Sequence, residues 1–187
     1  GTRIAFIGAT AYFRLFYNKL GWRMTEPYEE ISRVVNEVEG KCDCIVLLSH
    51  LGLETDERIA ATIPEISVIL GAHTHHILHH GKSVNNTLLC GAGKGGTYVG
   101  HAELSLDNSH RLNSVSTRLF DMNKQPAAEH EKDYVFSLHE IGKEQMMTEI
   151  CRLPKPIKVD WFSESPLVRL LCESLRTWCE ADCAFLN

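Results

Sequence analysis

Apolar residues near the start of the chain gather in short runs that alternate with helical patterns. The runs at 3–8, 42–49 and 66–70 have the length and composition of buried strands. Between them, apolar residues recur at helical spacing over 26–39 and 54–63. A strand–helix–strand–helix–strand order puts helical crossovers between parallel strands, so we expect an α/β layered arrangement.

After residue 80 the pattern changes to closely spaced strands. Runs at 84–90, 97–106 and 112–120 are strand-like and are separated by residues typical of turns. Because the connections between them are too short for helical crossovers, we expect antiparallel strands to follow the parallel unit.

Two further helices are expected in the rest of the chain. A polar pattern covers 128–150, and an amphipathic pattern covers 165–180. Ser165 is suited to cap the second of these helices, as Thr25 is suited to cap the first helix of the chain. Residues 181–186 are expected to begin a strand.

The composition is that of an ordinary globular protein. Of the 187 residues, 44% are hydrophobic and 23% are charged, which argues against disorder. The formal net charge of −5 argues against a polymeric nucleic acid as partner, because such binding needs a basic surface. No apolar run reaches the roughly 20 residues that span a bilayer, so no membrane span is expected.

The cysteine content bears on the cellular compartment. Seven cysteines are present, an odd number, and no Cys-x-x-Cys occurs. A disulfide framework or a zinc ribbon is therefore not indicated. We interpret the cysteines as buried, reduced thiols of a cytoplasmic protein, with an exported or cell-surface location as the alternative.

Histidines directly follow two of the expected buried strands. His50 comes after the strand at 42–49, and His73 and His75 come after the strand at 66–70. Parallel strands present their carboxyl ends at one edge of a sheet, so these imidazoles can converge there. In extended backbone, residues two apart point the same way, and imidazole is the commonest metal ligand. The pattern favours a metal site, with a histidine-rich loop of no function as the alternative.

Two segments resemble sequence motifs of a known enzyme family. Residues 49–52, Ser-His-Leu-Gly, and residues 69–75, Ile-Leu-Gly-Ala-His-Thr-His, resemble the last two motifs of the calcineurin-like metallophosphoesterases. Within that family, the chain looks most like the bacterial 5′-nucleotidase and 2′,3′-cyclic-nucleotide phosphodiesterase group. The segments 4–10, 85–94, 98–100 and 165–187 are also similar to that group.

The resemblance implies a domain organisation. Residues 1–125 would be the C-terminal half of a metallophosphoesterase domain, with a layered sheet and antiparallel closing strands. Residues 126–160 would be a helical linker. Residues 161–187 would begin the α/β C-terminal domain that binds substrate in this group.

The resemblance also implies roles for the histidines. His50 and His73 would bind one of two divalent metal ions (Mn, Zn or Fe), and His75 would bind the other. In the family, such ions polarise a phosphate and generate a hydroxide nucleophile from water. Hydrolysis of a phosphate ester is therefore implied, with a small-molecule nucleotide as substrate. At Ala72 the chain departs from the family, which usually has glycine there.

The family's other motifs, Asp-x-His, Gly-Asp and Gly-Asn-His, do not occur in the sequence. They supply the bridging aspartate, further ligands and the general-acid histidine, and they are expected before Gly1. No catalytic residue is therefore assigned within the chain, which alone is expected to be incomplete and inactive. The alternative is a non-catalytic scaffold or binding module that keeps the fold without a complete metal site.

Other candidate motifs have structural explanations. The glycine-rich residues 91–97 lack the spacing of a phosphate-binding Walker loop and precede a strand, so a turn is expected there. Within this turn, Lys94 is a candidate to meet the charge of a substrate. Asp56 and Glu57 fall in the first turn of a helix, where the helix dipole favours carboxylates without any catalytic role.

Overall fold

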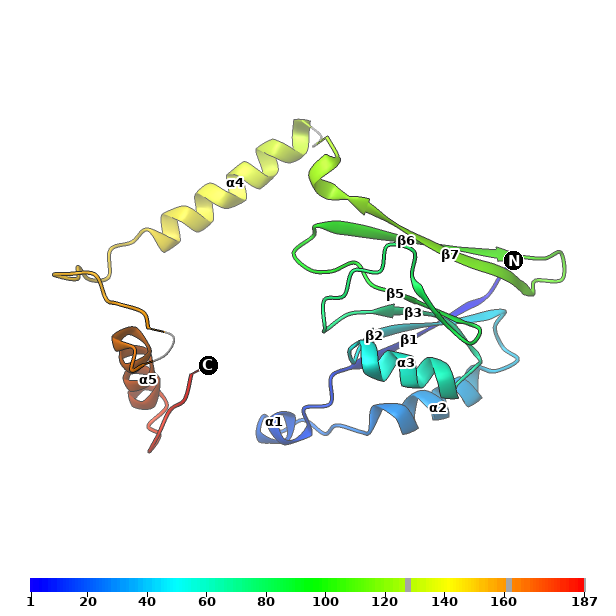
Figure 1. Cartoon of the computed structure of the whole chain (residues 1–187), viewed down its shortest axis with the longest axis horizontal. Helices are drawn as coiled ribbons and strands as arrows, with labels where there is room; N and C mark the ends of the chain where they lie inside the picture. Colours follow the sequence, from blue (N-terminus) through cyan, green and yellow to red (C-terminus); the bar gives the residue numbers. More distant parts are fainter. Residues whose placement is uncertain (127–128, 161–162, 187) are drawn as a thin grey trace. The chain divides into compact units, whose positions relative to one another are not determined.

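The computed structural model of the chain describes residues 1–126, 129–160 and 163–186 (Figure 1). The chain divides into two compact units, Gly1–Pro126 and Ala127–Asn187. Among the described residues, all the strands belong to the first unit, and two helices belong to the second.

A five-stranded sheet forms the centre of the first unit. Its strands are β1 (Ile4–Thr10), β2 (Cys44–His50), β3 (Ile66–Gly71), β4 (Lys82–Val84) and β5 (Thr87–Cys90). They lie in the order β1-β2-β3-β5-β4. Strands β1, β2, β3 and β5 are parallel to one another, and β4 pairs antiparallel with β5. The α/β arrangement expected from the sequence is confirmed. The run expected at 84–90 is interrupted, because the chain turns at Asn85, whose φ is 51°.

Two helices cover one face of this sheet (Figure 1). α2 (Pro27–Val38) and α3 (Leu53–Thr62) are the crossovers from β1 to β2 and from β2 to β3. Their apolar faces pack on the strands in one core cluster, and each Å² of apolar surface buried in this way contributes roughly 25 cal/mol. The most deeply buried members of the cluster include Val35, Leu47, Ile59, Ile66 and Ile69.

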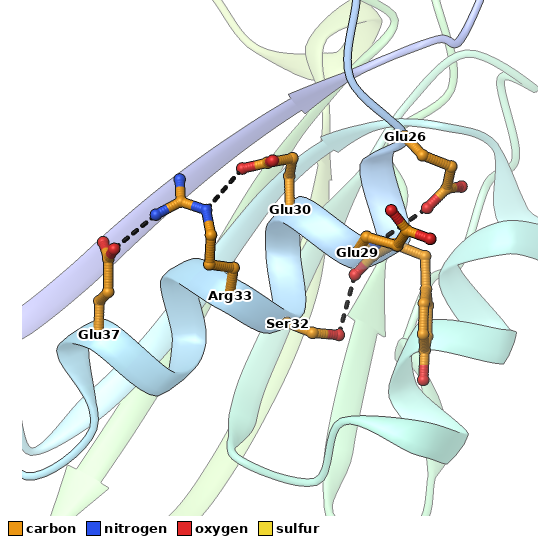
Figure 2. A network of polar contacts seen from close by, with 7 residues as sticks. Glu26, Glu29, Glu30, Ser32, Arg33 and Glu37 are labelled. Carbon is orange, nitrogen blue, oxygen red and sulfur yellow. Dashed lines mark hydrogen bonds and ion pairs between the residues drawn. The ribbon is translucent and has the colours of Figure 1, made fainter.

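The N-terminal cap of α2 differs from the expectation. The cap is Glu26 rather than Thr25, and its carboxylate accepts a hydrogen bond from the backbone N–H of Glu29 at 2.9 Å (Figure 2). Further along α2, Arg33 donates to two glutamates about one turn away on either side (Figure 2). These ion pairs are exposed and contribute little to stability, so the helix is held mainly by its buried face.

A second, two-stranded sheet packs on the other face of the first sheet. β6 (Tyr98–Leu106) and β7 (Leu112–Asp121) form the antiparallel pair expected from the sequence. Its side chains pack against Val46 and Val68, among others. A cavity of about 520 Å³ lies between the two sheets, lined mostly by apolar residues and by His101. The first unit is thus a layered structure of helices, central sheet and hairpin.

Two short elements are not apparent in the sequence pattern. They are α1 (Arg14–Lys19) and the 3₁₀ turn η1 (Met122–Lys124). α1 buries none of its residues and has no side chain capping its N-terminus, so neither apolar periodicity nor a cap residue indicates it.

The second unit contains α4 (Glu129–Met146) and α5 (Pro166–Trp178), which correspond to the two helices expected there. Ser165 caps α5 as expected, accepting a hydrogen bond from the backbone N–H of Val168. The prediction of a strand at 181–186 is wrong, since this segment has no regular structure. A strand needs a hydrogen-bonded partner, and the described part of this unit offers none.

Two further expectations concern the chain as a whole. The assignment of 126–160 to a linker and of 161–187 to a further domain stays a prediction. Residues 127–128, 161–162 and 187 lie outside the described part of the chain. In the part that is described, no helix has both the length and the apolar composition needed to cross a bilayer.

All seven cysteines are free thiols, but they are not all buried. Cys44 and Cys90 are buried, and burial raises the pKa of both thiols. Cys151, Cys179 and Cys183 are exposed, so the expectation of buried thiols is wrong for these three. The cytoplasmic location inferred from the cysteines stays a prediction.

Candidate metal centre

The ends of two parallel strands bring the first histidines together. β2 ends at His50 and β3 ends at Gly71, and Ser49 lies opposite Gly71 in the register of the two strands. The backbone N–H of Ala72 then donates to the carbonyl oxygen of Ser49 at 2.9 Å. The chain therefore leaves β3 beside His50, which places His73 within reach of it.

Two imidazoles meet at this edge of the sheet. The Nδ1 atom of His73 lies 3.3 Å from the Nε2 atom of His50, and the ring centroids are 5.0 Å apart. Two nitrogens bound at roughly 2.0–2.1 Å to one tetrahedral ion would lie about 3.3–3.4 Å apart. The pair thus has the spacing of two ligands of one cation. Imidazole nitrogens suit zinc, manganese and iron, so these residues fit a divalent metal ion.

His75 is placed differently from the expectation. His73 and His75 have φ values of 73° and 56°, so the backbone is left-handed at both and not extended. The two rings therefore do not point the same way by strand alternation, and that part of the sequence argument is wrong. In the described residues, no three His, Cys, Asp or Glu side chains form a group able to hold a metal ion. The structure joins His50 to His73, and the role of His75 stays a prediction.

Ala72, where the family usually has glycine, does not disturb this loop. Its φ is not among the positive values found in the chain, so its backbone has a conformation that residues other than glycine adopt without strain. The side chain is exposed, and its methyl group is accommodated.

The loop that carries the histidines is tied to the start of α3. The hydroxyl oxygen of Thr74 accepts a hydrogen bond from the backbone N–H of Leu53 at 3.1 Å and lies 2.8 Å from Nδ1 of His76. α3 begins after Gly52, which has no side chain to cap the helix. Thr74 satisfies the N–H of Leu53, one of the first four N–H groups that have no partner within the helix. Gly52 has a φ of 93°, and a Cβ there would lie 3.0 Å from Cγ2 of Thr74. Glycine at this position allows the close approach.

A buried carboxylate lies beneath both strand ends. Asp56, in the first turn of α3, is only 2% exposed, and the hydroxyl of Ser49 donates to its Oδ1 atom. Ser49 in turn accepts from the backbone N–H of Leu51 at 3.2 Å. A Cβ built on Gly71 would lie 2.6 Å from Oδ2 of Asp56, so the carboxylate fills the space that a side chain would need.

The environment of Asp56 alters its acidity. Removal from water raises its pKa from 3.8 to about 6, and the hydrogen bond from Ser49 opposes this by favouring the ionised form. From the sequence, the helix dipole alone accounts for Asp56, and its place behind the site is not predicted. An aspartate in the first turn of a helix is common, so the sequence holds no distinctive signal of this role.

The glycine-rich loop borders the histidine loop. The N–H of Leu78 donates to the carbonyl of Gly91 at 2.9 Å, and the N–H of Gly93 donates to the carbonyl of His76 at 3.0 Å. The loop is followed by the strand β6, whereas a Walker motif is followed by a helix, so the loop is not a Walker motif. Lys94 is exposed in it, and a role in meeting substrate charge stays a prediction.

The chain has a relative of similar sequence along its whole length. No family model matches the chain. It is 39% identical over 189 residues to the uncharacterized metallophosphoesterase YunD of Bacillus subtilis (strain 168), and the match covers 100% of the chain and 41% of YunD.

Solved structures share its fold. A putative 5′-nucleotidase from Staphylococcus aureus in complex with alpha-ketoglutarate matches with a TM-score of 0.66 at 19% identity, over 97% of this chain and 40% of that one. The sulfate thiohydrolase SoxB of Thermus thermophilus in complex with glycerol matches with a TM-score of 0.65 at 20% identity, over 75% of this chain and 27% of that one. These likenesses confirm the fold class. The chain spans less than half the length of each of these three proteins.

Proposed function

Because this chain is a homologue of the metallophosphoesterases, we propose that the protein hydrolyses phosphate esters with two divalent metal ions, and that its substrates are nucleotides. The observation that carries the proposal is the 3.3 Å approach of His73 to His50 at the carboxyl edge of the sheet. His50 and His73 would hold one ion (Mn, Zn or Fe), and His75 would contribute to the other. The fold shared with a putative 5′-nucleotidase supports nucleotides as the substrate class.

Bound metal ions supply the polarisation of phosphate oxygens and the lowered pKa of bound water that this hydrolysis needs. The residues of the chain hold the ligands in place. Ser49 and Asp56 fix the end of β2 from below, and Thr74 ties the histidine loop to α3. A ligand pair already held at binding distance loses little order on taking up an ion, which favours tight and well-oriented binding.

A non-catalytic scaffold or binding module of the same fold is the second candidate. It is favoured by the finding that, in the described residues, no group of three or more metal-binding side chains forms. A four-coordinate ion bound by two imidazoles alone would lack two of its four ligands. The two candidates therefore predict different properties of the full-length protein. A hydrolase binds metal and turns over substrate, whereas a scaffold does neither.

Ester hydrolysis by the full-length protein tests the proposal, with AMP followed by the phosphate released and 2′,3′-cyclic AMP followed by the ring-opened monoester formed. We expect AMP or 2′,3′-cyclic AMP to be hydrolysed with Mn, Zn or Fe present, and a chelator to abolish turnover. His50→Ala and His73→Ala should each lower the rate by roughly 100-fold or more, since even outer-shell partners of a metal cost 10–100-fold.

A matched histidine provides the control. His139 lies on α4, and its side chain is 71% exposed. His139→Ala should leave the rate unchanged. A full-length protein that retains no metal and hydrolyses neither ester would support the scaffold instead.

A further inference from the structure

One carboxylate in the first turn of α3 contacts both segments that lead to the paired histidines. Ser49, the residue before His50, donates its hydroxyl to Oδ1 of Asp56. The other oxygen, Oδ2, occupies the space beside Gly71, two residues before His73, where a Cβ would lie only 2.6 Å away. The side chain therefore lies against the chain just ahead of each imidazole.

Both partners of this hydrogen bond are shielded from water. Asp56 is 2% exposed and Ser49 is 4% exposed. A hydrogen bond to a buried carboxylate is stronger than one in water, because breaking it would leave the charge without a partner. Among the ion pairs formed by the described residues, none involves Asp56. An apolar side chain would avoid the cost of burying this charge, which favours a role for the carboxylate at the strand ends.

The same helical turn also holds the residue that follows the second histidine. The backbone N–H of Leu53, the first residue of α3, donates to the hydroxyl oxygen of Thr74 at 3.1 Å. The chain on both sides of His73 is thus fixed against one turn of helix, as is the residue before His50. The 3.3 Å separation of the two imidazole nitrogens is therefore set by contacts with the start of α3.

We propose that Asp56 is a positioning residue for the histidine pair. By holding Ser49 and packing against Gly71, its carboxylate keeps the ends of β2 and β3 at a fixed spacing. The two imidazoles then match one divalent ion before the ion binds, so little order is lost on binding. This inference rests on the proposed function, and it assigns part of the metal affinity to a side chain outside the ligand set.

The negative charge of Asp56 offers a different explanation of the same affinity. A nearby carboxylate attracts a cation whether or not it holds the ligands in place. The two explanations depend on different properties of the side chain. Positioning needs an oxygen that accepts from Ser49, whereas attraction needs the ionised form. Asparagine keeps the shape and the accepting oxygen but has no charge, so Asp56→Asn separates them.

The affinity of the full-length protein for Zn²⁺ tests the inference. It is measured at pH 7 by competition with a chromogenic chelator, for the site that His50→Ala removes. Asp56→Ala should weaken this affinity by about 10–100-fold, as expected when a partner of a metal ligand is lost. Asp56→Asn should stay within about threefold of the wild type. Ser49→Ala should weaken the affinity by about fivefold, the size of one hydrogen bond, and decides the matter where Asp56→Ala does not fold.

A core variant controls for loss of stability alone. Val35 lies on α2 and is 2% exposed, and Val35→Ala removes buried methyl groups without touching either strand end. It should lower the temperature of unfolding and change the Zn²⁺ affinity by less than about twofold. A loss of affinity in Val35→Ala equal to that in Asp56→Ala would overturn the inference.

The remaining outcomes separate this inference from the proposed function. Wild-type affinity in Asp56→Ala or in Ser49→Ala would overturn the positioning role and leave the proposed function standing. Equal losses in Asp56→Asn and Asp56→Ala would assign the effect to charge and would overturn it as well. A wild type with no Zn²⁺ site that depends on His50 would remove the metal pair of the proposed function itself.

Discussion

At the scale of single residues, one buried carboxylate supports the histidines from behind. Asp56 accepts from Ser49, the residue before His50, and its other oxygen lies against Gly71, two residues before His73. One side chain thus contacts both strand ends that lead to the pair. Its burial has a cost, because the ionised form is removed from water with few compensating bonds.

The raised pKa of Asp56 makes stability depend on pH. The folded state favours the protonated form, with a pKa of about 6 against 3.8. The contribution to stability is therefore complete below pH 3.8 and is lost as the pH rises through 6. The free energy of unfolding of the wild type minus that of Asp56→Asn should fall by roughly 2–3 kcal/mol from pH 4 to pH 7.

Urea denaturation of the full-length protein in a chelator measures this difference. Asp133→Asn, which alters an exposed carboxylate on α4, serves as the matched control and should show no such trend. A wild type and an Asp56→Asn variant that respond identically to pH would contradict the burial argument.

At the scale of elements, the close approach of α3 to the end of β3 depends on a missing side chain. A Cβ at position 71 would lie 2.6 Å from Asp56 Oδ2 and 3.3 Å from the carbonyl oxygen of Cys90. Gly71→Ala should therefore lower the free energy of unfolding by roughly 1–3 kcal/mol, since the helix or the strand must shift. Gly8→Ala, in β1, where nothing lies within 4 Å, should cost far less. Chemical denaturation measures the free energy of unfolding of the two variants. Equal losses in Gly71→Ala and Gly8→Ala would contradict the close packing of Asp56 against Gly71.

The order of the elements could be predicted because it depends on local pattern. Buried runs and helical spacing located the strands and crossovers, and the strand ends then indicated where His50 and His73 would meet. The strand at 181–186 was predicted wrongly because pairing depends on partners distant in sequence. The helix α1 was not predicted because a six-residue exposed helix has no apolar periodicity.

The details of the site were less predictable. The left-handed backbone at His73 and His75 belongs to a loop whose path is set by Thr74 and by the N-terminus of α3. Likewise, the burial of Asp56 arises only when α3 packs under two strands. Contacts of this kind join residues 7 to 21 positions apart, and hydrophobic pattern carries no information about them.

At the scale of the whole molecule, the chain is a layered α/β unit followed by a second, helical unit. The resemblance to metallophosphoesterases, which rested on two strand-end histidine motifs, is confirmed by a relative that matches along the entire chain. Since the chain spans 41% of that relative, the substrates, the metal ions and their ligands all belong to the proposal. What the structure shows is a pair of imidazoles held close together at the ends of two paired strands.

Metal content of the full-length protein tests most directly whether His50 and His73 share one ion. Bound metal per protein is measured by mass spectrometry after dialysis for the wild type, His50→Ala, His73→Ala and the double variant. Each single variant should lose the same one ion, and the double variant should lose no more than either. Retention of all metal by both single variants, or separate losses that add in the double variant, would contradict a shared site.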